Sequence, residues 1–180
     1  VAGISAQSLA TLLGLSDSGP IIRCMPNTPA LVGEGMTGLY SNSHAGAAEG
    51  KALAERVMSS VGQCVWVEKE SDLDVVTAIS GSGPAYFFLF IESLTDAAIA
   101  LGMDSNSARK LALQTALGAS RLASLSDEDA ATLRKNVTSP GGTTEQAIQS
   151  FETSDIRGTV ARATQAAARR SVELSQEFGV

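Results

Sequence analysis

The residues best suited to chemistry lie in one short segment, Val137-Thr138-Ser139-Pro140-Gly141-Gly142-Thr143-Thr144-Glu145-Gln146. Pro140 and the two glycines predict an exposed turn, and Thr143 with Gln146 three residues later forms a capping-box pattern that predicts the start of a helix. Free backbone N–H groups at a helix start attract anions. Because hydroxyl side chains flank this turn, we expect it to hold a carboxylate without a base or a metal. A cap that serves only its own helix is the alternative.

Two other segments are punctuated by glycine or proline. Met25-Pro26-Asn27-Thr28-Pro29 follows a predicted strand, and loops at the carboxyl ends of strands face the ligand crevice of an α/β sheet. A rigid turn without a ligand fits it equally well. Ser80-Gly81-Ser82-Gly83-Pro84-Ala85-Tyr86 lacks the G-x-G-x-x-G spacing of a phosphate loop and follows a helical stretch. It predicts a tight turn with Pro84 at the first helical position, or a close crossing of helices.

The first seventy residues alternate strand-like and helix-like runs. Ser5 is the expected cap of a helix through about Leu13, and a second helix is expected over 45–60. Strands are expected over 20–25, 36–41 and 63–67, the first of them buried. Alternating elements of this kind are typical of a layered α/β sheet.

From Ser71 onward the pattern is helical throughout, so we place a domain boundary near residue 70, between an α/β part and an all-α part. Helices are expected over about 107–124, with a cap among residues 104–106, and over 144–151. Ser126 is the expected cap of a short helix between these two. A long final helix is expected from the apolar stripe that runs from Ile156 to Leu174.

One helical run, from Ala85 to Ile91, is apolar on every side. A helix without a polar face should be buried all round. Because a helical part of 110 residues can hardly bury such a helix by itself, we expect a second subunit to cover it and the protein to be a homodimer or a higher homo-oligomer.

Composition excludes several classes of partner. The net charge is −6, and residues 1–70 carry 4 basic against 6 acidic side chains while residues 71–180 carry 9 against 13, so no basic face for nucleic acid is expected. The longest uncharged run, Val75 to Ile91, is short and broken by glycine and proline, so no membrane span is expected.

Cys24 and Cys64 fit a reducing cytoplasm. Because the sequence begins at Val1, we expect it to be a fragment.

Four motifs together resemble the Δ1-pyrroline-5-carboxylate reductase family: residues 23–29, residues 80–86, Gln114-Thr115-Ala116-Leu117-Gly118-Ala119 and residues 137–144. The resemblance implies a cytoplasmic oxidoreductase that reduces the cyclic imine to L-proline with NADPH or NADH, the last step of proline biosynthesis. It also implies a fold with the C-terminal portion of a Rossmann domain over residues 1–70 and a helical dimerisation and substrate-binding domain over residues 71–180. The N-terminal half of the Rossmann domain, with its glycine-rich dinucleotide loop, is not in this sequence.

The resemblance also implies roles for individual residues. Ser139 and the backbone of Gly142 and Thr143 would bind the substrate carboxylate, and the hydroxyl of Thr144 would meet the ring nitrogen as the catalytic group. Glu70 would line the substrate pocket, although Glu68 and Glu70 also fit plain surface charges. The residues implied near the cofactor are Ala2 and Asn136.

Two other functions remain open at this stage. The chain could be a non-catalytic helical dimerisation module, because a truncated chain without a complete cofactor site could do no more. It could also be a dehydrogenase of the β-hydroxyacid type, although such enzymes use a lysine in the helical domain and Lys110 and Lys135 stand in solvated-looking Arg-Lys pairs.

Overall fold

The computed structural model describes residues 3–15, 20–42 and 48–178. The chain forms two compact units, the first built from Val1–Ala85 with Ala161–Val180 and the second from Tyr86–Val160. The units therefore divide at Ala85 and Ala161, whereas the sequence places a boundary near residue 70. The change of structural class does fall there, since the last described strand ends at Trp66 and every later described element is a helix.

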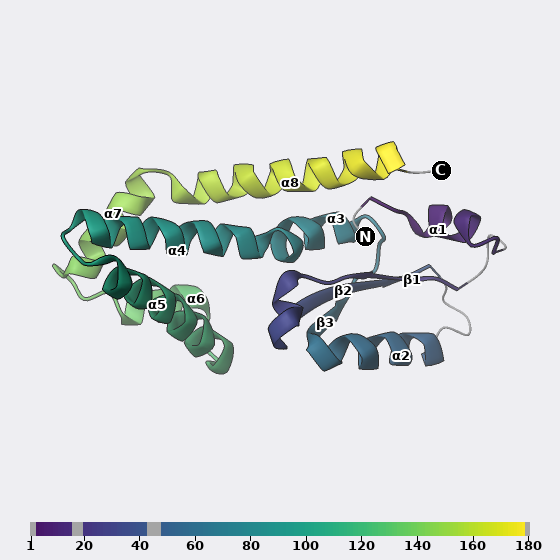
Figure 1. Ribbon diagram of the computed structural model, residues 1–180, viewed down its shortest axis with the longest axis horizontal. Helices are drawn as coiled ribbons and strands as arrows, with labels where there is room; N and C mark the ends of the chain where they lie inside the picture. Colours follow the sequence, from purple (N-terminus) through teal and green to yellow (C-terminus); the bar gives the residue numbers. More distant parts are fainter. Residues whose placement is uncertain (1–2, 16–19, 43–47, 179–180) are drawn as a thin grey trace. The chain divides into compact units, whose positions relative to one another are not determined.

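The first unit contains a small sheet and the helices around it (Figure 1). Its elements are α1 (Ala6–Leu12), β1 (Ile22–Met25), the 3-10 turn η1 (Thr28–Val32), β2 (Gly35–Ser41), α2 (Ala48–Met58), the 3-10 turn η2 (Ser59–Val61), β3 (Gly62–Trp66), α3 (Asp72–Val76) and the π-helical turn η3 (Thr77–Gly81). The three strands and two helices expected from the sequence are confirmed in the described residues. Residues 45–47 of the second expected helix lie outside them, and β1 is half-buried rather than buried.

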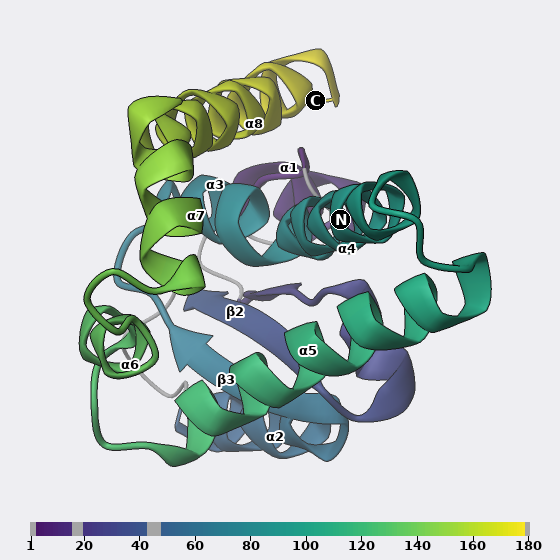
Figure 2. The ribbon, with the colours of Figure 1, turned by 90° about the vertical axis from the view of Figure 1, so that its left-hand side faces the viewer.

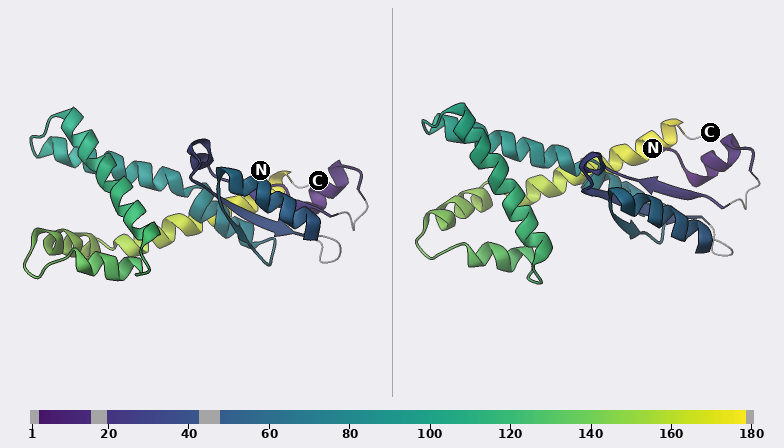
Figure 3. Two further views of the ribbon diagram at one scale, coloured as in Figure 1. Left: turned by 90° about the horizontal axis from the view of Figure 1, so that it is seen from below. Right: turned by 60° about the horizontal axis from the view of Figure 1, so that its bottom comes forward.

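The sheet has the order β1-β2-β3, with β1 antiparallel to β2 and β2 parallel to β3. In both views of Figure 3, α2 lies alongside these strands. Gly38 of β2 faces α3, because a Cβ added there would lie 2.6 Å from Val76 Cγ1. Its neighbours Thr37 and Leu39 point to the opposite face, which α2 covers, and are 1% and 0% exposed. The middle strand is therefore the most buried strand, and a hydrophobic cluster of Ala6, Ala10 and Ile21, with Leu9 and Tyr40 packed against it, forms beside it.

The second unit consists of helices, whose path from α5 through α6 into α7 can be followed in Figure 2. Its helices are α4 (Gly83–Ala100), α5 (Ser105–Leu125), α6 (Ala130–Asn136) and α7 (Thr143–Thr153). The last helix, α8 (Ile156–Phe178), belongs to the first unit from Ala161 onward. Ala108 and Ala112 of α5 are buried, and the rings of Phe90 and Phe151 lie 6.2 Å apart. Phe90 and Phe151 thus bring a residue of α4 and a residue of α7 into contact.

The apolar helix expected to be buried on all sides is instead exposed in the isolated chain. Of the residues of α4, only Gly83 is buried, and Phe87, Phe88 and Leu89 are each more than 60% exposed. The reason is that a single chain does not supply enough surface to cover this helix. The run Asp72–Ala100 is also long and apolar enough to cross a membrane by length and composition alone, a test that apolar core helices of other proteins also pass.

The predicted cap of α6 is wrong. Ser126 does accept a hydrogen bond, but from the N–H of Glu128 at 3.0 Å, in a local turn before the helix. The N-cap is Asp129, whose Oδ1 accepts the N–H of Thr132 at 2.7 Å. Several capping residues stand in a row in this segment, and the three-dimensional path of the chain selects the last of them.

This cap predicts a dependence of stability on pH. The hydrogen bond from the Thr132 backbone N–H lowers the pKa of Asp129 below its ordinary value. The ionised cap is thus favoured only in the folded chain, so its stabilisation is complete above the unfolded pKa of about 3.9 and is lost as pH falls through the folded pKa. An NMR titration of the carboxyl carbon should show this low value, and Ser126→Ala should leave it unchanged. A midpoint at or above that of an unfolded aspartate would contradict the assigned cap.

Candidate functional site

The segment between α6 and α7 forms a tight turn over Ser139–Gly142. Within this turn, the N–H of Gly142 donates to the carbonyl of Ser139 at 3.0 Å. Pro140 occupies the second position and Gly141 the third, with φ of +71°. Proline followed by a glycine with positive φ is the sequence that a type II turn requires. The turn expected from Pro140 and the glycines is therefore confirmed.

The predicted capping box at the start of α7 is wrong. The N-cap is Gly142, which has no side chain to cap with, and α7 begins at Thr143. The side chain that reaches back belongs to Glu145, whose Oε2 accepts the N–H of Gly141 at 2.8 Å. Sequence reasoning missed this residue, although a glutamate three positions after the N-cap is the usual signal for such a contact.

The hydrogen bonds divide the amides of this segment into two groups. The N–H of Gly142, predicted as a carboxylate donor, is engaged by the Ser139 carbonyl, so in this structure it is not free. The N–H groups of Thr143, Thr144 and Glu145 fall in the first turn of α7, before intrahelical donors begin, and have no hydrogen-bond partner among the described residues. Of the two backbone donors predicted, Thr143 is therefore open and Gly142 is engaged, while Thr144 and Glu145 add two open N–H groups that were not predicted.

Hydroxyl groups stand beside these open amides. The side chains of Ser139, Thr143 and Thr144 are exposed and make no hydrogen bond within the described part of the chain. Each charge-assisted hydrogen bond to a carboxylate contributes about 1.5–3 kcal/mol, and the helix dipole adds about 0.3–1 kcal/mol. The geometry can therefore bind a small carboxylate, with a hydroxyl available to a second group of the same ligand.

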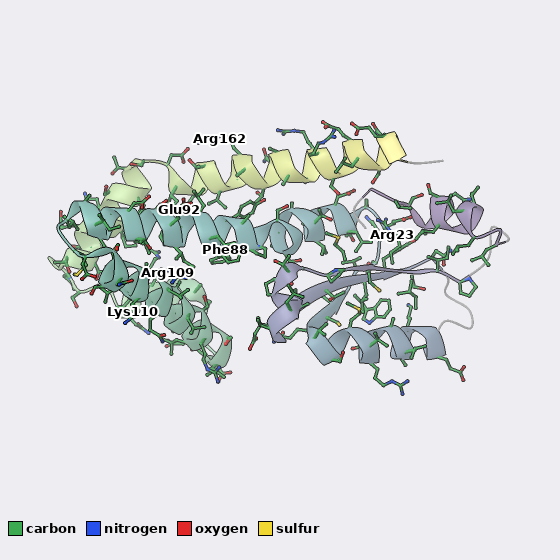
Figure 4. All side chains as sticks on the ribbon, viewed as in Figure 1. Arg23, Phe88, Glu92, Arg109, Lys110 and Arg162 are labelled. Carbon is green, nitrogen blue, oxygen red and sulfur yellow. The ribbon has the colours of Figure 1, made fainter. Side chains whose placement is uncertain are left out.

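Glu70 does not behave as a plain surface charge. Its Oε1 accepts the N–H of Ala6 at 2.6 Å and pairs with Arg23 Nη1 at 2.7 Å, while the side chains of Arg23 and Glu70 are 13% and 32% exposed. Figure 4 labels Arg23 in this region. Glu70 thus ties the first turn of α1 to β1. Oε2 makes no hydrogen bond to any residue that the structure describes.

Replacing Glu70 with alanine should lower the free energy of unfolding by about 1–3 kcal/mol, because it removes two bonds and leaves the Arg23 guanidinium without its partner. Glu68→Ala is the matched control, since Glu68 is exposed on the same stretch, and should change stability by less than about 0.5 kcal/mol. Urea unfolding of the two variants measures the difference. Equal stabilities would show that the contacts of Glu70 contribute nothing.

Of the two residues predicted to lie near a cofactor, the structure describes only Asn136. Asn136 is the last residue of α6, is exposed, and donates from Nδ2 to Glu128 Oε2 at 2.9 Å. Ala2 lies outside the described residues. Glu70 belongs to the first unit, while Asn136 and the Ser139–Thr144 turn belong to the second.

One described segment has the glycine spacing of a dinucleotide-binding loop. Residues 33–38 do have the G-x-G-x-x-G spacing, but they close η1 and begin β2 instead of joining a strand to a helix. Packing explains two of the glycines, because a Cβ on Gly35 would lie 2.8 Å from the Val61 carbonyl oxygen and one on Gly38 would strike Val76.

The comparisons with known proteins agree with one another. Residues 70–174 match the family model described as pyrroline-5-carboxylate reductase dimerisation. The chain is 47% identical over 178 residues to the pyrroline-5-carboxylate reductase of Pseudomonas aeruginosa, covering 99% of this chain and 64% of that protein. It is 43% identical over 154 residues to the pyrroline-5-carboxylate reductase of Pisum sativum, covering 86% of this chain and 56% of that protein.

Solved structures give the same result. A pyrroline-5-carboxylate reductase from Coxiella burnetii superimposes with a TM-score of 0.91 at 42% identity, over 97% of this chain and 63% of that one. The pyrroline carboxylate reductase of Plasmodium falciparum, solved with NADP bound, gives a TM-score of 0.86 at 36% identity, over 97% of this chain and 65% of that one. The chain therefore spans a little under two thirds of the length of the relatives it matches.

Proposed function

The chain belongs to the pyrroline-5-carboxylate reductase family, and from that premise we propose that it serves the reduction of Δ1-pyrroline-5-carboxylate to L-proline with a hydride from NADPH or NADH. The observation that carries this proposal is the row of open amides at the start of α7, flanked by the hydroxyls of Ser139, Thr143 and Thr144. A cyclic imine that carries a carboxylate needs both kinds of group.

The substrate carboxylate accepts hydrogen bonds from the N–H groups of Thr143 and Thr144 and from the Ser139 hydroxyl. Gly142 shapes the turn that presents these donors, and its own N–H becomes a further donor if the bond to the Ser139 carbonyl opens. With the carboxylate fixed, the imine carbon is held in one orientation. Holding reactants in a productive geometry is the largest contribution that such a site can make.

Thr144 is the proposed catalytic residue. Its hydroxyl donates to the ring nitrogen or relays a proton to it, which makes the imine carbon a better hydride acceptor. NAD(P)H, when bound, supplies the hydride. Glu70 remains the acidic residue that the family resemblance proposes for the substrate pocket, and in its own unit its Oε1 is engaged by Arg23 and Ala6. Ala2 and Asn136 remain the residues proposed to lie near the cofactor.

A second copy of the chain is the proposed partner, in a homodimer or higher homo-oligomer. Three observations support it: the match of residues 70–174 to a dimerisation family model, the exposed apolar face of α4, and a cavity of about 330 Å³ between α4 and α5. Figure 4 labels Phe88, Glu92 and Arg109, which line this cavity. An apolar face of this kind is typical of an interface between subunits. The cytoplasm is the proposed location, with neither nucleic acid nor a membrane as partner.

The direct experiment follows the oxidation of NADPH and of NADH by the intact protein in the presence of pyrroline-5-carboxylate, with formation of L-proline measured separately. The 180-residue chain is assayed in parallel, and its mass in solution is measured by size-exclusion chromatography with light scattering. Turnover by the intact protein is expected. A dimer that oxidises neither cofactor and binds no L-proline in calorimetry would overturn the proposal and leave a non-catalytic dimerisation module.

A further inference from the structure

Two of the motifs in the sequence are not used by the carboxylate site, and one side chain joins them. Asn27, in the segment of residues 25–29, accepts the N–H of Met36 on Oδ1 at 2.9 Å. Its Nδ2 donates to the carbonyl of Ser80 at 3.0 Å. Met25 adds a second contact, because its Cε lies 2.8 Å from the position of a Cβ on Gly81. The two motifs, 53 residues apart, therefore meet within the first unit.

The Ser80 carbonyl has no hydrogen-bond donor within its own helix, because the residue that would donate is a proline. In a continuous α-helix it would accept the N–H of the residue four positions on, but that residue is Pro84, which has none. The chain widens at this point into the π-helical turn η3, in which Ser82 N–H donates to the Thr77 carbonyl at 2.8 Å. Wide turns of this kind inside helices are frequent at functional sites. The Asn27 amide replaces the donor that the helix lacks.

Asn27 also holds the start of a turn whose two largest side chains are exposed. It is the residue before η1, and the side chains of Leu31 and Val32 at the end of η1 are 89% and 77% exposed. The bonds from Asn27 anchor the start of this turn to β2 on one side and to η3 on the other. The anchored region lies at the carboxyl end of β1, which is antiparallel to β2, and it adjoins the π-helical turn η3, a kind of turn that is frequent at functional sites.

We propose that Asn27 is a positioning residue for hydride transfer, which holds η1 and the backbone of Ser80–Ser82 in one fixed arrangement at the carboxyl end of β1. The inference rests on the proposed function, because the nicotinamide is the group that this arrangement would orient. Asn27 acts through the two backbone segments and does not itself touch the reacting atoms. The donors for the substrate carboxylate, at the start of α7, are separate from it.

The test is Asn27→Asp in the intact protein. Aspartate still accepts the Met36 N–H, but it places an oxygen against the Ser80 carbonyl where the amide donated. The matched control is Asn42→Asp, since Asn42 Oδ1 accepts the N–H of Ile21 at 2.8 Å beside the other end of β1. Asn27→Ser, which is too short to bridge both groups and adds no charge, is the second variant in case the aspartate prevents folding.

The expected result is a kcat lower by about 10²-fold per folded active site, as for a small displacement of reacting groups, with the KM for pyrroline-5-carboxylate changed less than twofold. The primary isotope effect measured with deuterated NADPH should rise, because hydride transfer becomes slower than the other steps. Asn42→Asp should change none of these. If the wild type is active and the Asn27 variants match the control, or lose activity only as folded protein is lost with an unchanged isotope effect, the role of Asn27 is refuted. An inactive wild type would instead refute the proposed function.

Discussion

Replacing Thr144 with alanine is expected to lower kcat of the intact protein by about 10²–10⁴-fold, the usual contribution of a positioned proton donor. Thr144 is the second residue of α7, is exposed, and makes no side-chain hydrogen bond among the described residues. Its hydroxyl is thus not needed to build the helix. The free energy of unfolding should change by less than about 0.5 kcal/mol, so that the effect falls on turnover.

Two variants test whether the hydroxyl is the cause. Thr144→Ser keeps a hydroxyl at the same position and should retain most of the turnover. Thr153→Ala removes a threonine from the other end of α7 and should behave as the wild type. Steady-state oxidation of NADPH measures all three variants. Wild-type turnover in Thr144→Ala would remove Thr144 from the mechanism.

Replacing Gly142 with valine is the second large effect. A Cβ at this position would lie 3.0 Å from the Ser139 carbonyl oxygen, so that carbonyl must give way by a few tenths of an ångström, and we expect the amides that follow it to shift with it. Loss of one charge-assisted bond, about 1.5–3 kcal/mol, corresponds to roughly 10- to 150-fold weaker binding of L-proline. Isothermal titration calorimetry of the intact protein measures this change.

Two further variants separate geometry from a general effect of substitution. Gly50→Val on α2 is the matched control, because a Cβ there meets only Ile22 Cδ1 at an ordinary 3.5 Å. Glu145→Gln keeps an acceptor for the Gly141 N–H but removes a negative charge beside the bound carboxylate, so it should tighten binding. An unchanged dissociation constant for Gly142→Val would contradict the assignment of this turn as the carboxylate site.

Periodicity predicted the elements well, because the spacing of apolar residues decides which face of a helix or strand can be buried. The caps were predicted less well. Around residue 126 several residues can cap, and only the path of the chain decides that Asp129 does so. At the start of α7 the two glycines fix the turn, but whether an amide is free depends on the reach of Glu145 and on the Ser139 carbonyl.

Contacts between distant residues could not be predicted from one sequence. Glu70 meets the N–H of Ala6 across 64 positions, and Asn27 meets Ser80 across 53. Neither pair shares a period or a local pattern, so only the folded chain brings them together. Because of these contacts, Glu70 is a structural residue and not a plain surface charge. The motifs at residues 25–29 and 80–86 are likewise in contact.

The apolar helix shows a second reason why a prediction from the sequence can differ from the structure of the single chain. The pattern of residues 85–91 predicts burial on every side, yet the isolated chain leaves Phe87 and Phe88 more than 60% exposed. Hydrophobic pattern reports the environment in the final assembly, and a single chain contains only part of that environment. The prediction of a partner subunit and the exposure of α4 therefore belong to the same explanation.

The central claim is that the amides of Thr143 and Thr144 bind the substrate carboxylate. It is tested most directly by ¹H–¹⁵N NMR of the intact protein titrated with L-proline and, separately, with L-prolinamide, which has the same ring but no carboxylate. The account predicts saturable shifts of these two amides with L-proline and none with L-prolinamide. Equal shifts with both ligands, or L-proline binding that leaves both amides unmoved, would contradict it.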